Sequence, residues 1–170
     1  MTEFYNYLIE NIFQFMGVLF SIIYVLYSIR QNILCWPALI IAAVFNLYAY
    51  YLINLPLQSI MQLFFILTAF YGWYNWRKSQ EKTTLLVNRW QIKNHLTWLT
   101  IGLISTLAIG FILKNLNTNP VFYSNYPFLD SLMFVFNIIP MYMTGKKVLE
   151  CWIYFIGIDI ISGVFYAITG

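Results

Sequence analysis

Four polar side chains interrupt stretches of this sequence that are otherwise long and apolar: Asn46, Gln62, Asn137 and Asp159. Asp159 is the most informative, because a carboxylate at the centre of a membrane costs about 2.5–3.5 kcal/mol on insertion scales. A binding site or water-filled cavity for a cation would offset this cost. The alternatives are a hydrogen bond between packed helices and a carboxyl group kept neutral by burial. The three amides either contact a ligand or bond neighbouring helices.

Aromatic residues make up 21% of the chain, more than interface belts alone require. Flat rings suit an aromatic cation, by stacking and by cation–π attraction of about 0.5–2 kcal/mol each. Tyr71 and Trp73 flank Gly72, which lets a flat ligand or a neighbouring backbone come close. Trp152 and Tyr154 open the last apolar stretch, and Tyr154 is expected to point inward. The interface belt is the alternative for the tryptophans nearest the charges, Trp36, Trp76 and Trp152.

Together, the polar and aromatic sets predict one substrate-binding cavity on which Asn46, Gln62, Asn137 and Asp159 converge. A scaffold protein would instead pair these groups off in separate helix contacts. Two further residues are predicted to act in gating. Asp130 lies near the outer end of its apolar stretch, where it acts as a cap or a gate. Pro140 removes a backbone hydrogen bond inside a helix, and the kink either serves as a hinge or shapes the cavity.

Enzymatic chemistry finds little support in the composition. The chain has one histidine, six acidic residues and two cysteines. A membrane-embedded enzyme needs a paired acid and base or a metal cluster. We interpret Cys35 and Cys151 as small apolar packing residues. The sequence therefore predicts no enzyme, no metal, no cofactor and no nucleic-acid partner.

The chain as a whole reads as an all-α membrane protein. Of its 170 residues, 61% are hydrophobic and 9% charged, against about 25% charged in soluble domains. Its apolar runs are long enough to cross a hydrocarbon core of about 30 Å at about 1.5 Å per residue. About six transmembrane helices are predicted: Ile12–Ile29, Ile33–Ile53, Pro56–Trp76, Leu96–Leu113, Tyr126–Thr144 and Leu149–Thr169.

The positions of the basic residues predict how these helices are oriented across the membrane. With the N-terminus outside, Lys114 alone of the nine basic residues falls outside, and the positive-inside rule favours this orientation. The expected division of the chain is a first three-helix repeat, a cytoplasmic linker, a connector transmembrane helix, an outer loop and a partial second repeat of two helices. The corresponding ranges are 1–76, 77–95, 96–113, 114–125 and 126–170.

An internal repeat appears when the chain is shifted by 116 residues. Asn32–Trp36 then lies over Val148–Trp152, and Tyr50 lies over Tyr166. Both copies start on the inner side, so the repeat is parallel, a known transporter plan seen in SWEET proteins. The counterpart of the third helix would fall beyond Gly170. We expect either a shortened C-terminus or a second half completed by a partner chain.

Several motifs along the chain are characteristic in combination: Gly17 through Arg30, Leu34–Pro37, Leu57–Trp76 with its Tyr-Gly-Trp-x-x-Trp ending, Asp130-Ser131, Lys147–Trp152 and Asp159. Together they resemble the PnuC family of bacterial vitamin transporters. The resemblance implies a three-plus-one-plus-three helix plan, here with the last helix absent, in a multi-pass protein of the bacterial inner membrane. It also implies a homo-oligomer, a trimer in the type structure.

The activity implied by the resemblance is facilitated diffusion of a small aromatic vitamin or nucleoside. The type member moves nicotinamide riboside, and relatives handle thiamine or other vitamins. No ion or ATP is coupled, and a cytosolic kinase traps the substrate by phosphorylation. The sequence departs from the family pattern at Pro56, Gln58, Met141 and Phe155, which leaves the vitamin open. A non-transporting membrane assembly partner is the remaining alternative.

Overall fold

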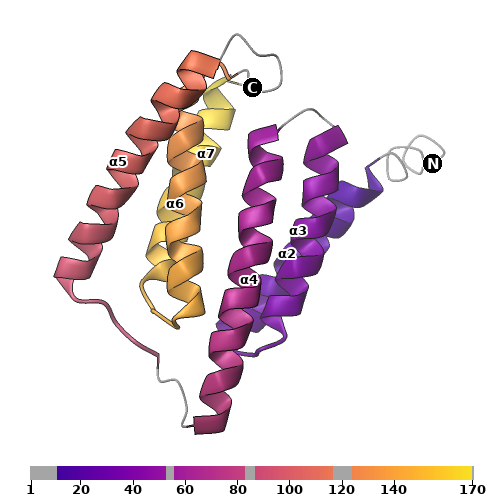
Figure 1. Cartoon of the computed structure of the whole chain (residues 1–170). Coiled ribbons are helices and arrows are strands. Elements are labelled where there is room, and N and C mark those ends of the chain that lie inside the picture. Colours follow the sequence, from indigo (N-terminus) through magenta and orange to yellow (C-terminus); the bar gives the residue numbers. More distant parts are fainter. Residues whose placement is uncertain (1–10, 53–55, 83–86, 117–123, 170) are drawn as a thin grey trace. The chain divides into compact units, whose positions relative to one another are not determined.

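The computed structural model describes residues 11–52, 56–82, 87–116 and 124–169, and it divides the chain into two compact units, Met1–Glu81 and Lys82–Gly170 (Figure 1). The first unit contains α2 (Ile12–Ile29), α3 (Cys35–Leu52) and α4 (Pro56–Lys82). The second contains α5 (Ile92–Leu116), α6 (Pro127–Gly145) and α7 (Cys151–Thr169). Within the described residues, an isolated bridge between Asn88 and Val148 is the one piece of strand-like pairing.

Four of these helices, α2, α3, α5 and α6, are long and apolar enough to cross a membrane. The shortest has 18 residues, which corresponds to about 27 Å of helix. Their outward faces are apolar: Leu26 is 54% exposed and Ile104 63% exposed. Such surfaces suit lipid rather than water. The prediction of an all-α membrane protein with six helices agrees with the described structure.

Two helices extend beyond their predicted ends. α4 continues to Lys82, six residues past Trp76, and α5 begins at Ile92 instead of Leu96. The added residues include Arg77, Lys78 and Lys93, whose unbranched side chains favour helix. The end of the apolar stretch therefore marks the edge of the hydrocarbon but not the end of the helix.

In the first unit, α3 and α4 are held together by an indole ring that lies on a glycine. A Cβ atom at Gly72 of α4 would lie 2.1 Å from Cη2 of Trp36 in α3. The rings of Trp36 and Trp76 meet edge to face at 5.2 Å, and the two side chains are 0% and 2% exposed. Both tryptophans are therefore core residues, and the interface-belt interpretation of them is wrong.

In the second unit, small residues let α5 approach α6. Gly102, Thr106 and Gly110 are spaced four residues apart and are all buried. A Cβ atom at Gly102 would lie 3.0 Å from Phe136, and one at Gly110 would lie 2.4 Å from Phe128, both on α6. This is the small-xxx-small packing that drives helix association in membranes, where burial of apolar surface gives no advantage over lipid.

The turns of the two helical hairpins, α2–α3 and α6–α7, have the same geometry at a shift of 116 residues. Gln31 and Lys147 each have a φ of 54°, the left-handed conformation that commonly ends a helix. The hydrogen bonds correspond one by one. They are Arg30 N–Leu26 O with Lys146 N–Tyr142 O, Gln31 N–Ser28 O with Lys147 N–Thr144 O, and Asn32 N–Tyr27 O with Val148 N–Met143 O.

The contact at Gly72 gives a testable prediction. Gly72→Ala should destabilise the protein by about 1–3 kcal/mol, because the added methyl group overlaps the fully buried ring of Trp36. Gly163→Ala is the matched control, since a Cβ atom there meets nothing within 4 Å. Thermal unfolding in detergent measures both variants. Equal midpoints would contradict the packing described for α3 and α4.

Candidate functional site

The first unit brings two of the predicted polar residues to the same depth. α3 and α4 run antiparallel (Figure 1). The indole of Trp36 in α3 lies over Gly72 of α4. Ten residues further along α3 is Asn46, and ten residues back along α4 is Gln62, so both lie about 15 Å from that contact. Gln62 is buried at 4% exposure. Asn46 lies against α2, where its Oδ1 occupies the space that a Cβ of Gly17 would need.

Tyr71 and Trp73 lie on two different faces of α4. Trp73 is half-buried and lies eleven residues, about three turns, from Gln62, so the two share a face of the helix. Tyr71 is on the exposed side, at 37% exposure. The flat group that lies over Gly72 is the indole of Trp36. The structure thus accounts for this glycine by packing, and the roles of Tyr71 and Trp73 in binding stay predictions.

The second unit also brings two predicted residues to one depth. In the first hairpin, Gly17 of α2 faces Asn46 of α3. The residues at the same distances from the matching turn of the second hairpin are Met133 of α6 and Ser162 of α7, so these two lie at one depth. One turn closer to the hairpin turn, Asn137 is level with Ile158 and Asp159. Each lies about 12 Å from the end of its helix, near the middle of a hydrocarbon core of about 30 Å.

Asn137 and Asp159 differ in their surroundings. The Asn137 amide donates to the carbonyl of Met133 at 2.8 Å, within its own helix. Asp159 is exposed on α7 and lies on the same helical face as Trp152 and Phe155, whose rings are 6.2 Å apart. This face therefore presents an acid and two aromatic rings together. The convergence of all four polar residues on one cavity stays a prediction.

A cluster of aromatic rings lies at the end of the second unit where α5 and α7 begin and α6 ends. We call it the aromatic cluster; it consists of Trp90, His95, Trp98, Tyr142 and Tyr154. Trp90 stacks on Trp98 at 5.9 Å, and His95 stacks on Tyr154 at 5.8 Å. The Nδ1 atom of His95 is 2.9 Å from the Tyr154 hydroxyl, a hydrogen-bond distance. Tyr154 points inward in the unit, as predicted.

The segment before α5 is positioned by main-chain hydrogen bonds to the α6–α7 turn. Asn88 N donates to Lys147 O at 2.9 Å, and Leu149 N donates to Asn88 O at 2.9 Å. Trp90 N donates to a carboxylate oxygen of Glu150 at 3.4 Å. Sequence reasoning missed Trp90, His95 and Trp98. The available signal was the chain's single histidine three residues before a tryptophan, a spacing that puts both on one face of a helix.

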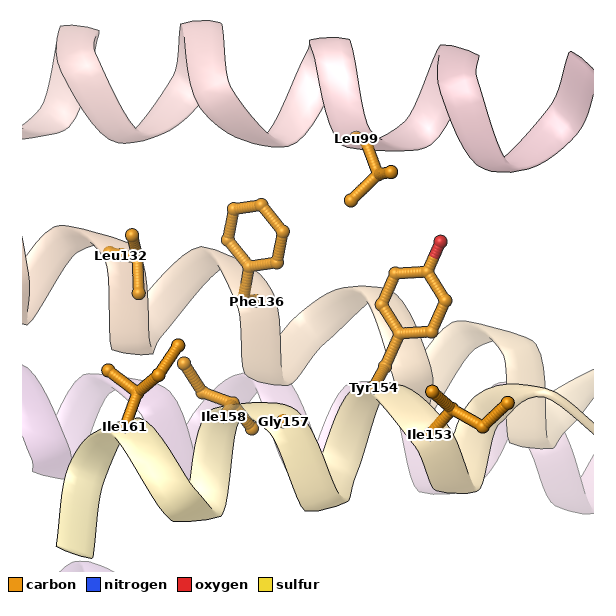
Figure 2. A pocket seen from close by; sticks show the side chains of 8 residues that line it. All are labelled: Leu99, Leu132, Phe136, Ile153, Tyr154, Gly157, Ile158 and Ile161. Carbon is orange, nitrogen blue, oxygen red and sulfur yellow. The ribbon is translucent and has the colours of Figure 1, made fainter. Parts of the chain in front are cut away.

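A pocket of about 270 Å³ opens between α5, α6 and α7, with Tyr154 at one end (Figure 2). Its wall is formed by leucine, isoleucine and phenylalanine side chains, among them Leu99, Phe136 and Ile158. Gly157 lies in the wall, and a Cβ atom there meets nothing within 4 Å. The Tyr154 hydroxyl is the one polar side-chain group among the lining residues. We call this pocket the apolar groove.

The two predicted gating residues lie at different levels of α6. Asp130, in the first turn, accepts a hydrogen bond from the Ser124 hydroxyl, which in turn accepts from Tyr126 N at 3.1 Å. No side-chain hydrogen bond caps the helix at Tyr126, so the role of Asp130 as a cap or a gate stays a prediction. Pro140 is buried, and it cannot donate to the carbonyl of Phe136 in the groove wall. Its role as a hinge stays a prediction.

No three histidine, cysteine, aspartate or glutamate side chains lie close enough together to hold a metal ion in the part of the chain that the structure describes. Each unit instead places polar side chains at mid-depth, amides in the first unit and an amide and an acid in the second, and four of the helices are long and apolar enough to cross a membrane. These features define a multi-pass membrane protein with polar groups at mid-depth, the class to which carriers of small molecules belong.

Comparison with known proteins identifies the family. The chain belongs to the nicotinamide mononucleotide transporter family, whose family model matches residues 11–170. It is similar to the nicotinamide riboside transporter PnuC of Escherichia coli (strain K12) and to that of Shigella flexneri, each 28% identical over 147 residues. The alignment covers 71% of this chain and 59% of each relative, so the chain spans less than two thirds of their length. No solved structure matches the chain. The assignment makes it a multi-pass inner-membrane protein.

The His95–Tyr154 contact gives a prediction of its own. Tyr154→Phe should lower the free energy of unfolding by about 1 kcal/mol, since it removes the hydroxyl that meets His95 at 2.9 Å. Tyr51→Phe, at a ring that is 70% exposed on α3, is the control and should change little. Thermal unfolding of the purified protein compares them. Identical losses in the two variants would mean that the bond adds no stability.

Proposed function

We propose that this chain carries nicotinamide riboside, or a closely related vitamin precursor, across the bacterial inner membrane. The observation that carries the proposal is the family match over residues 11–170, together with relatives named as nicotinamide riboside transporters. The chain covers only part of those relatives, so their substrate is a proposal for this chain.

The chemistry of the polar residues supports this substrate class. Nicotinamide riboside joins an aromatic cation to a sugar with hydroxyl groups. Asp159, on a face with Trp152 and Phe155, offers negative charge and ring surface. The amides of Gln62 and Asn137 offer donors and acceptors for hydroxyl groups. We assign Asn46, Gln62, Tyr71, Trp73, Asn137, Trp152, Tyr154 and Asp159 to substrate binding on these grounds.

The topology we propose is a parallel repeat with α5 as the connector. The matching turns at Gln31 and Lys147 support a duplicated hairpin, and α4 completes the first triplet. The charge distribution of the sequence supports an outside N-terminus. In this plan residues 1–76 and 126–170 are the complete and partial repeats, 77–95 the cytoplasmic linker, 96–113 the connector and 114–125 the outer loop.

Transport in this proposal is alternating access without a coupled ion, and the protein acts as a carrier and not as an enzyme. Asp130 gates the outer end, where it already holds Ser124, and Pro140 provides the hinge. Phosphorylation by a cytosolic kinase prevents the return of the substrate. The working assembly is a homo-oligomer, a trimer by analogy with the family.

Uptake by substituted proteins tests the site. In cells that lack their own transporter, Asp159→Ala and Gln62→Ala should each reduce uptake of labelled nicotinamide riboside to background, because each removes a polar group at mid-membrane depth. Gln14→Ala, at an exposed glutamine of α2, should retain uptake. Asp159→Asn separates the loss of charge from the loss of hydrogen bonding.

Membrane insertion of every variant is checked by immunoblotting of the membrane fraction. Uptake at the unsubstituted level by both alanine variants would remove these residues from the site.

A ligand panel decides between vitamins. At 100 times its dissociation constant, a bound substrate stabilises the folded protein by about 2.7 kcal/mol. Nicotinamide riboside should raise the unfolding midpoint of the purified protein, while thiamine, riboflavin and deoxynucleosides should not. A shift with thiamine alone would make thiamine the substrate. A flat response to the whole panel would favour the membrane assembly partner over a carrier of these compounds.

A further inference from the structure

We propose that the second unit binds one anionic phospholipid, with an acyl chain in the apolar groove and the phosphate against a neighbouring group of basic side chains. The site is separate from the residues proposed to bind the vitamin, except at Tyr154, and its test does not depend on transport.

The lining of the groove excludes a sugar and suits a hydrocarbon chain. Leu99, Phe136 and Ile158 present only carbon to its interior, and one hydroxyl, that of Tyr154, lies at its end and is already within bonding distance of His95. Ribose hydroxyls buried here would lose their hydrogen bonds with water and gain few in return. A hydrocarbon chain makes no hydrogen bonds with water and therefore loses none in the groove.

The size and course of the groove also fit an acyl chain. Its volume of about 270 Å³ exceeds the apolar cavities of about 150 Å³ that hold a benzene ring. Along α7 it extends from Ile153 to Ile161, eight residues or about 12 Å. Ile153 is at the hairpin-turn end of α7, and Ile161 lies deeper in the apolar stretch. The groove therefore runs from one membrane surface toward the bilayer centre, the path of a lipid tail.

Basic side chains gather at the surface end of the groove. The pairing of Asn88 with Lys147 and Leu149 brings the segment before α5 beside the α6–α7 turn. Arg89 of the first segment, Lys93 in the first turn of α5, and Lys146 and Lys147 of the turn supply four cations. All are exposed except Lys147, which is half-buried. Glu150 is the one acid among them, and it accepts a hydrogen bond from Trp90 N.

The aromatic cluster connects the cations to the groove. Lys146 Nζ lies 4.8 Å from the centre of the Tyr142 ring, which is 5.0 Å from the Trp98 ring. Trp98 precedes Leu99 of the groove wall, and Trp90, stacked on Trp98, follows Arg89. Tryptophan and tyrosine favour the headgroup level of a bilayer. Basic groups, interfacial rings and an apolar groove therefore follow one another in the order of a phospholipid's phosphate, glycerol and tail.

Selectivity must come from the headgroup. Lipid tails are as apolar as leucine side chains, so the groove alone gains little over the surrounding bilayer. Each lysine or arginine near an anionic surface favours binding by about fivefold. The occupant is therefore a phospholipid with a negative headgroup, such as phosphatidylglycerol, and not the zwitterionic phosphatidylcholine.

Native mass spectrometry of the full chain from mixed micelles tests the headgroup. Phosphatidylglycerol and phosphatidylcholine with identical tails are compared, and glycerol phosphate is added as a competitor without tails. Phosphatidylglycerol should be retained preferentially. Arg89→Gln and Lys93→Gln should each weaken its binding by about fivefold. Lys114→Gln, at an exposed lysine at the opposite end of α5, should leave it unchanged.

The groove is tested by filling it. Gly157→Leu adds a side chain where a Cβ atom meets open space in the groove, and Gly163→Leu adds one at an equally open position that does not line it. Gly157→Leu should cause loss of phosphatidylglycerol retention, because the added side chain occupies the space proposed for the acyl chain, while Gly163→Leu should retain it. Equal binding by the two leucine variants, equal retention of both lipids, or full competition by glycerol phosphate would each overturn the proposal.

Discussion

Hydrocarbon offers no hydrogen-bond partner, and this constraint decides where the polar groups of the chain go. Several serine and threonine hydroxyl groups in the helices donate to a carbonyl one turn back: Thr68 to Phe64, Thr100 to Leu96, Ser131 to Pro127 and Thr144 to Pro140. The Asn137 amide does the same with Met133. Two buried polar atoms have no partner among the described residues, Trp36 Nε1 and Thr106 Oγ1. Each costs about 1–3 kcal/mol, so close packing must hold them there.

That packing depends on pairing small residues with large ones. Gly72 accepts Trp36, Gly17 accepts Asn46, and Gly110 accepts Phe128. The two hairpins share their turns, but their interiors differ. Phe20 and Phe45 stack at 6.1 Å in the first hairpin, and the corresponding positions in the second are Phe136 and Ile161, which line the apolar groove. In the second hairpin, Ile161 stands in place of a ring and Tyr154 in place of Ala38, and both residues line the open groove.

Much of this fold could be predicted from the sequence. The bounds of α2, α3, α6 and α7 follow the apolar stretches to within two residues, because the hydrocarbon thickness sets their length. The depth of Asn46, Gln62, Asn137 and Asp159 follows from counting along the helices. The direction of a side chain cannot be predicted by such counting, because it depends on contacts between helices. Four features therefore needed the structure: the indole over Gly72, the exposure of Asp159, the pairing of Asn88 with the distant α6–α7 turn, and the aromatic cluster around His95.

Flux through the purified chain is the most direct test of the central claim, that polar groups held at mid-depth carry a vitamin without an energy source. The chain is reconstituted into liposomes, and labelled nicotinamide riboside is added outside with no ATP and no ion gradient. The account predicts saturable uptake that stops when the inner and outer concentrations are equal, and faster exchange when unlabelled substrate is present inside. Uptake no faster than in protein-free liposomes, or accumulation only in a proton gradient, would contradict it.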